Sequence, residues 1–157
     1  MLYFSLVQSQ ITYDGIVSWG GAYKNALSNL EVLQKWILKI IFNRSRLYSS
    51  DRLFKESGVL DIRQLFSLAA LLDFFKYKNN AASLNHQYLK RNKNAPVNKK
   101  CRKTIGQRSH KYIQIKIFNQ LPIEIKQTNS YFVYKKLVKN WLQITPRNAI
   151  HLLVDNR

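Results

Sequence analysis

The sequence predicts an all-α protein, and three observations support that fold class. Apolar residues recur at helical spacing in several long stretches, while no run alternates with the two-residue period of a strand. Five glycines and three prolines in 157 residues leave room for long helices. A hydrophobic content of 46% favours a folded chain over full disorder. We expect a helical bundle over residues 1–78, a basic, partly disordered linker over 79–110, a small helical segment over 111–145 and a loose tail over 146–157.

The first helices follow from apolar spacing. Residues 1–13 are predicted as a helix with apolar residues at Tyr3, Leu6, Val7, Ile11 and Tyr13, interrupted afterwards by Asp14-Gly15 and then by Gly20-Gly21. Residues 23–43 give the clearest helix, because its apolar residues succeed one another at spacings of 3, 3, 4, 3 and 1. They form one stripe: Leu27, Leu30, Leu33, Ile37, Ile40 and Ile41.

Capping residues mark the ends of the next two helices. Ser49 or Ser50 precedes a short helix over 51–57, and Gly58 stands where a glycine ends a helix. Asp61 is expected to cap a helix over 62–78. The apolar residues of this helix cover more than one face, so we expect it to be central, with neighbours on two sides.

The second half begins with the 79–110 segment, in which polar residues dominate and apolar ones lack a period. An apolar pattern returns over 111–119 and ends at Leu121-Pro122, after which a short helix runs through Lys126. Ser130 is expected to cap a final helix to about Ile144, with Pro146 stopping it.

The three tryptophans differ in their surroundings. Trp19 and Trp141 lie on apolar faces and are expected in the core, whereas Trp36 lies beside the apolar stripe of its helix. We expect Trp36 to be partly exposed.

The charge of the chain is concentrated in its middle third. Residues 74–123 contain twelve Lys and Arg but no Asp or Glu, and they carry two-thirds of the formal net charge of +18. Such a block of positive charge needs a counter-charge. Nucleic acid phosphate is the most common one, and an anionic membrane surface is the second most common. A solvated basic linker that attracts any polyanion is the alternative.

The candidate nucleic-acid-binding residues therefore come from this window. They are Lys90, Arg91, Lys99, Lys100, Arg102, Lys103, Arg108 and Lys111. Their expected role is contact with phosphates of RNA or DNA without sequence preference. Tyr88 and Tyr112 flank the block and are placed to stack on unpaired bases. The run from Lys99 to Lys103 also matches the weak pattern of a nuclear import signal.

Catalytic and cofactor chemistry are not predicted. The acids include no adjacent pair for two metal ions, and the three His do not cluster with Cys101 at zinc-ligand spacing. Cys101 is a single cysteine, so no disulfide forms within the chain. We expect no cofactor, no independent enzyme and no membrane span, in an intracellular protein of the nucleus or cytoplasm.

Several short runs, in order, resemble a known family. They are residues 2–13 (LYFSLVQSQITY), 16–21 (IVSWGG), 33–35 (LQK), 38–41 (LKII), His86 with Arg91, 104–109 (TIGQRS), 118–126 (FNQLPIEIK), Phe132, and 135–137 (KKL). Together these runs, spanning about residues 2–142, are similar to the region after the palm in reverse transcriptases of jockey-like non-LTR retrotransposons. The resemblance implies a helical thumb followed by part of the C-terminal segment.

What the resemblance implies is a piece of an RNA-directed DNA polymerase. In that family the thumb grips the primer–template duplex, and the C-terminal segment helps to hold RNA or target DNA. The palm with its paired aspartates, the fingers and the endonuclease are absent, a single Cys cannot build the zinc knuckle of some relatives, and Lys90 stands where Thr is commoner. The resemblance thus implies a non-catalytic fragment, from a truncated element or an incomplete gene model.

Two other function classes remain open from the sequence. The broad apolar face of the 62–78 helix suggests an interaction fragment whose partner, such as the palm of the parent polymerase, is missing. The basic window also suits a peripheral membrane binder.

Overall fold

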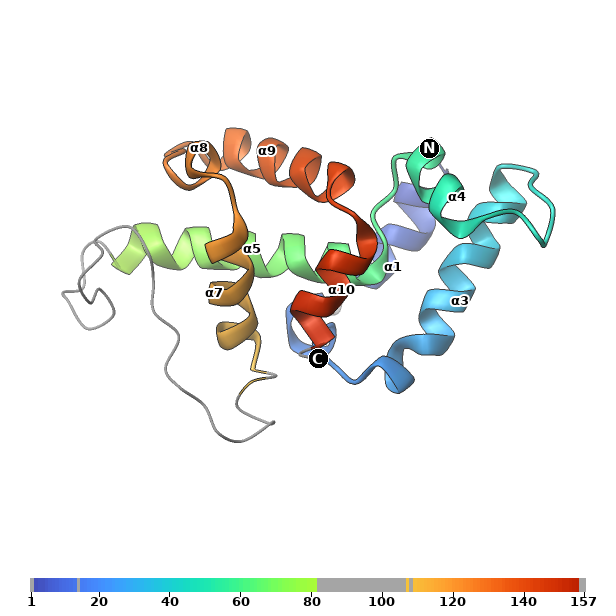
Figure 1. The fold of residues 1–157 in the computed structure, drawn as a ribbon, viewed down its shortest axis with the longest axis horizontal. Helices are drawn as coiled ribbons and strands as arrows, with labels where there is room; N and C mark the ends of the chain where they lie inside the picture. Colours follow the sequence, from blue (N-terminus) through green and yellow to red (C-terminus); the bar gives the residue numbers. More distant parts are fainter. Residues whose placement is uncertain (1, 14, 82–106, 108, 156–157) are drawn as a thin grey trace.

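The computed structural model describes residues 2–13, 15–81, 107 and 109–155, with the backbone alone for 77–81 (Figure 1). Within these ranges every regular element is helical and there is no strand, which confirms the all-α prediction. α5 runs through the middle of the molecule, with α9 along one side and α7 crossing it (Figure 1).

The N-terminal segment is one helical run that changes type. η1 (Tyr3–Gln8) is a π-helix and leads directly into α1 (Ser9–Tyr13). Tyr3 and Ile11 are buried, but Leu6 and Tyr13 are exposed, so the predicted apolar face is only half correct. Gly15 has a φ of 66° and separates this run from α2 (Ile16–Trp19), as the sequence predicts.

Gly20 follows α2 at a point where no side chain fits. A Cβ there would lie 2.6 Å from the carbonyl oxygen of Ile16 and 2.6 Å from the Phe66 ring. The absence of a side chain lets α2 pack directly on α5, and Trp19 packs half-buried against the same core. The core placement predicted for Trp19 and Trp141 is confirmed.

α3 (Lys24–Ile41) turns a different face inward from the one its apolar stripe predicts. The buried residues are Leu27, Gln34 and Leu38, while Leu33 is 51% exposed and Ile40 is 63% exposed. Gln34 Nε2 donates hydrogen bonds to the Tyr3 hydroxyl at 2.7 Å and to the Leu60 carbonyl at 2.9 Å. These polar partners come from other segments, and they satisfy the buried Gln34 side chain about one residue away from the expected face.

α4 (Ser50–Ser57) ends at Gly58, whose φ of 61° confirms the predicted glycine stop. α5 (Ile62–Ala81) begins at Asp61 as expected. Asp61 Oδ1 accepts a hydrogen bond from the Gln64 amide at 2.8 Å, and Gln64 Oε1 accepts one from the Asp61 amide at 3.1 Å. This reciprocal pair is a capping box.

The second half supplies α7 (His110–Gln120), α8 (Ile123–Lys126) and α9 (Tyr131–Ile144) close to their predicted bounds. The prediction of a loose tail is wrong. α10 (Arg147–Asp155) follows, with Ile150 and Val154 fully buried against the core. Pro146 stops α9 and also starts α10, because its carbonyl accepts hydrogen bonds from the Ala149 and Ile150 amides.

One main hydrophobic core joins both halves of the chain around α5. It includes Ile16, Phe66, Ile117, Val138 and Val154, which come from five different helices. The prediction that α5 is central is confirmed. A smaller cluster beneath α3 and α4 contains Tyr3, Leu38, Leu53, Phe54 and Val59.

The exposed face proposed for the 62–78 helix is wrong. α2, α7, α9 and α10 cover α5, and its apolar residues from Ile62 to Phe75 are mostly buried. Exposed apolar side chains lie on other elements instead, among them Leu6 on η1, Leu33 on α3, Phe132 on α9 and Leu152 on α10. Within the described part of the chain, none of the helices combines the length and apolar character that crossing a bilayer takes.

Candidate nucleic-acid interface

Seven of the eight predicted nucleic-acid-binding residues lie outside the described residues. These are Lys90, Arg91, Lys99, Lys100, Arg102, Lys103 and Arg108, together with the flanking Tyr88. Lys111 is described and is exposed in the first turn of α7, beside the half-buried Tyr112. The structure therefore places only Lys111 of the predicted set.

Arginine and histidine side chains engage most of the described carboxylates. Arg63 pairs with Glu31 and Asp155, Arg44 pairs with Glu56, and Arg147 pairs with Asp51 and Asp61. His151 Nε2 also lies 3.0 Å from Asp61 Oδ2. Five of the described acids are thus already paired with an arginine or histidine of the fold.

Arg63 is the most deeply placed of these cations, with 1% of its side chain exposed. Its guanidinium lies 3.0 Å from Asp155 Oδ1 and 3.4 Å from Glu31 Oε1, and it donates to the carbonyls of Gly20 and Ala22 at 3.2 and 3.0 Å. The two carboxylate contacts are ion pairs by distance, although their angles are poor for hydrogen bonds. Arg63 thereby joins α5 to α3, to the α2–α3 connection and to α10.

Asp61 anchors the other end of α10. Its Oδ2 accepts a hydrogen bond from Arg147 Nε at 2.8 Å and lies 3.0 Å from His151 Nε2. Burial alone would raise the pKa of Asp61, but the contacts with His151 and Arg147 outweigh it and hold that pKa below its ordinary value. The pairing of His151 with Asp61 is structural, because it ties α10 to the start of α5.

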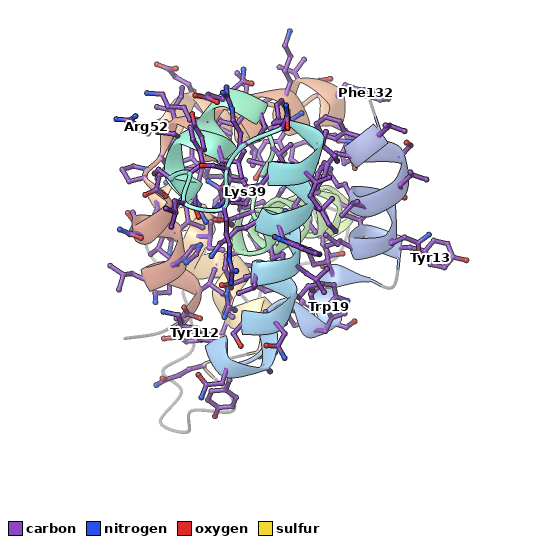
Figure 2. The ribbon with its side chains drawn as sticks, turned by 90° about the vertical axis from the view of Figure 1, so that its right-hand side faces the viewer. Tyr13, Trp19, Lys39, Arg52, Tyr112 and Phe132 are labelled. Atoms are coloured by element: carbon purple, nitrogen blue, oxygen red, sulfur yellow. The ribbon has the colours of Figure 1, made fainter. Side chains whose placement is uncertain are left out.

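A cationic surface remains on α3, α4 and the connection between them. Six cations here pair with no described carboxylate: Lys24, Lys35, Lys39, Arg46, Arg52 and Lys55. All three acids of this region already face an arginine, since Glu31, Asp51 and Glu56 pair with Arg63, Arg147 and Arg44. In Figure 2 this face points to the viewer, with Lys39 where α3 faces α4 and with Arg52 farther out on α4.

An open hollow of about 620 Å³ lies in this surface, and we call it the α3–α4 hollow. Its lining comprises Val32, Lys35, Trp36, Lys39, Arg46 and Ser50. Lys39 Nζ donates a hydrogen bond to the Arg46 carbonyl at 2.5 Å, which fixes the connection against α3. The lining thus combines an aromatic ring, three cations and a hydroxyl, and it contains no acid.

The structure does not bring Lys111 into this hollow. Tyr112, its neighbour on α7, lies in the lower part of Figure 2, well separated from Lys39. Sequence reasoning placed Lys35 and Lys39 off the apolar stripe and expected Trp36 to be partly exposed, which its 60% exposure confirms. It missed the grouping with Arg46, because the α3–α4 connection brings that residue back only in the folded chain.

Metal-binding groups of three or more His, Cys, Asp or Glu do not occur among the residues that the structure describes. In comparisons with known proteins, no family model matches the chain, and neither a curated protein nor a solved structure does.

Proposed function

We propose that the chain binds RNA or DNA without catalysing a reaction, as the thumb and post-thumb part of a retrotransposon RNA-directed DNA polymerase. The observation that carries the binding function is a cationic surface whose acids are already engaged. On α3, α4 and the connection between them, three carboxylates each face an arginine, and six further cations have no described carboxylate partner. The acid-free window of residues 74–123 adds twelve more Lys and Arg. A polyanion supplies the missing counter-charge.

The polymerase origin rests on the sequence resemblance, and the all-α fold agrees with a helical thumb. A palm with paired aspartates, encoded in frame upstream of Met1, would establish this origin.

Filter binding to an RNA hairpin and to a primer–template duplex tests the binding function. Changing Lys99, Lys100, Arg102 and Lys103 together to Ala should weaken binding to both ligands, because four phosphate contacts are lost. If about six phosphates are engaged, log K for the duplex falls with log salt at a slope near −5, and the variant slope is shallower.

A charge-preserving control separates charge from side-chain identity. The variant with Lys99, Lys100 and Lys103 changed to Arg keeps the positive charge and should retain most of the affinity. Equal affinity of the wild type and the four-alanine variant would remove this segment from the interface. Affinity that does not change with salt would contradict phosphate binding altogether.

A protein-interaction function is the second candidate, and one observation favours it. A groove of about 270 Å³ between η1–α1 and α3 is lined mainly by apolar side chains, among them Leu6 and Leu33, both of which are largely exposed. Sedimentation equilibrium tests this function, because such a surface drives self-association. A monomer at all concentrations, with nucleic acid binding intact, would argue against it.

A further inference from the structure

We propose that the α3–α4 hollow is a binding site for an unpaired nucleotide of single-stranded RNA or DNA. The base stacks on the Trp36 indole, and the flanking phosphates contact Lys35, Lys39 and Arg46. This inference rests on the proposed nucleic-acid binding and names a site and a ligand class for it. The site lies outside the basic window that the sequence indicates.

Trp36 is placed as a stacking platform and not as a core residue. Its side chain is 60% exposed, whereas Trp19 and Trp141 pack against the main core. Val32, one turn earlier on α3, is 62% exposed and extends the apolar wall beside the indole. An exposed tryptophan in a hollow leaves a large aromatic surface in water that a ligand ring would cover.

The charges around Trp36 match a phosphate backbone. Lys35, Lys39 and Arg46 line the same hollow, and no acidic residue does. Both acids of α4 are already engaged: Glu56 accepts a hydrogen bond from Tyr48 and pairs with the Arg44 guanidinium at 3.0 Å, and Asp51 pairs with Arg147 at 2.8 Å. Since Lys39 also donates to the Arg46 carbonyl, the cationic wall is held in place before a ligand arrives.

The combination of an aromatic ring and cations favours a single strand over a duplex. In a duplex the base faces are stacked on one another, so an indole on a helix surface cannot cover them without unstacking. Aromatic platforms with surrounding cations are the usual means of binding unpaired strands without sequence preference. The hollow volume also falls within the range of about 300–1,000 Å³ that small-ligand sites occupy.

Fluorescence anisotropy of a labelled oligothymidylate tests the proposal on the full chain, with a perfectly paired duplex as the second probe. Trp36→Ala should weaken single-strand binding by about tenfold, as expected for one lost stacking contact, and should change duplex binding far less. The single-strand affinity of Trp36→Phe should fall between those of the wild type and Trp36→Ala, because phenylalanine still offers a ring. Oligothymidylate should also quench tryptophan emission in the wild type but much less in Trp36→Phe.

Two further variants complete the design. Tyr13→Ala is the matched control, because Tyr13 is an exposed aromatic residue at the far edge of the face in Figure 2 and should leave both affinities unchanged. Lys39→Gln should weaken single-strand binding and reduce its salt slope by about 0.7, as expected for one phosphate. Circular dichroism checks that each variant is folded.

The outcomes separate this site from the proposed function. A wild type that binds both probes while Trp36→Ala and Lys39→Gln bind oligothymidylate as tightly would overturn the site and leave nucleic-acid binding standing. A wild type that binds neither probe would overturn both. Poly-glutamate binding that weakens in Trp36→Ala and Lys39→Gln as much as oligothymidylate binding does would assign the hollow to acidic polypeptides and overturn the nucleotide site.

Discussion

Replacing Arg63 by methionine is expected to destabilise the fold severely, because it leaves two largely buried carboxylates without a cation. The guanidinium is buried, lies 3.0 Å from Asp155 and 3.4 Å from Glu31, and donates to two backbone carbonyls. Methionine fills similar space without charge, so Glu31 and Asp155 would remain largely buried without a cation. Removing one partner of a buried ion pair costs about 3–5 kcal/mol, a large fraction of the roughly 5–15 kcal/mol of a typical domain.

Urea unfolding followed by circular dichroism measures the effect. With a slope of about 2 kcal/mol per molar urea, the expected loss lowers the unfolding midpoint by roughly 1.5–2.5 M. Arg63→Lys should lose an intermediate amount, since one ammonium cannot reach two carboxylates and two carbonyls with the geometry of a guanidinium.

A triple variant tests the cause of that loss. Adding Glu31→Gln and Asp155→Asn to Arg63→Met removes the two unpaired carboxylate charges and should recover a substantial part of the lost stability. A loss below about 1 kcal/mol for Arg63→Met would refute the reasoning, because it lies well under the cost of an uncompensated buried charge. A triple variant no more stable than the single one would refute it as well.

Two smaller predictions concern α9 and α10. Tyr134→Phe should raise the free energy of unfolding by up to about 1 kcal/mol. The buried Tyr134 hydroxyl has no hydrogen-bond partner among the described residues, so Phe removes its desolvation cost. An unchanged or lower urea midpoint would contradict this. The contribution of Asp61 should be complete above its ordinary pKa of 3.8 and should be lost as the pH falls through its lower pKa in the folded state. Asp61→Asn should therefore flatten the dependence of the urea midpoint on pH in that acidic range, and an unaltered dependence would show that Asp61 does not carry it.

Local sequence signals located most helix ends. Asp61 with Gln64 forms a capping box, Gly58 takes a positive φ, and Pro122 precedes α8, each at its predicted place. Such signals are readable because a cap depends on residues within one turn of each other. The sequence predicts Pro146 only as the stop of α9 and therefore does not predict α10, although a proline before a helix is also a common start.

Tertiary contacts decided which faces are buried and which charges remain outside. The sequence alone determined the all-α class, the excess of cations and the shortage of acids. It could not show that Gln34 and Glu31 would turn inward on α3, because their partners Tyr3, Leu60 and Arg63 lie some 26 to 32 residues away along the chain. With Gln34 buried, the exposed Trp36 lines the hollow together with Lys39 and Arg46. Hydrogen bonds and ion pairs between distant segments have no local signature, so the hollow could be found only in the folded chain.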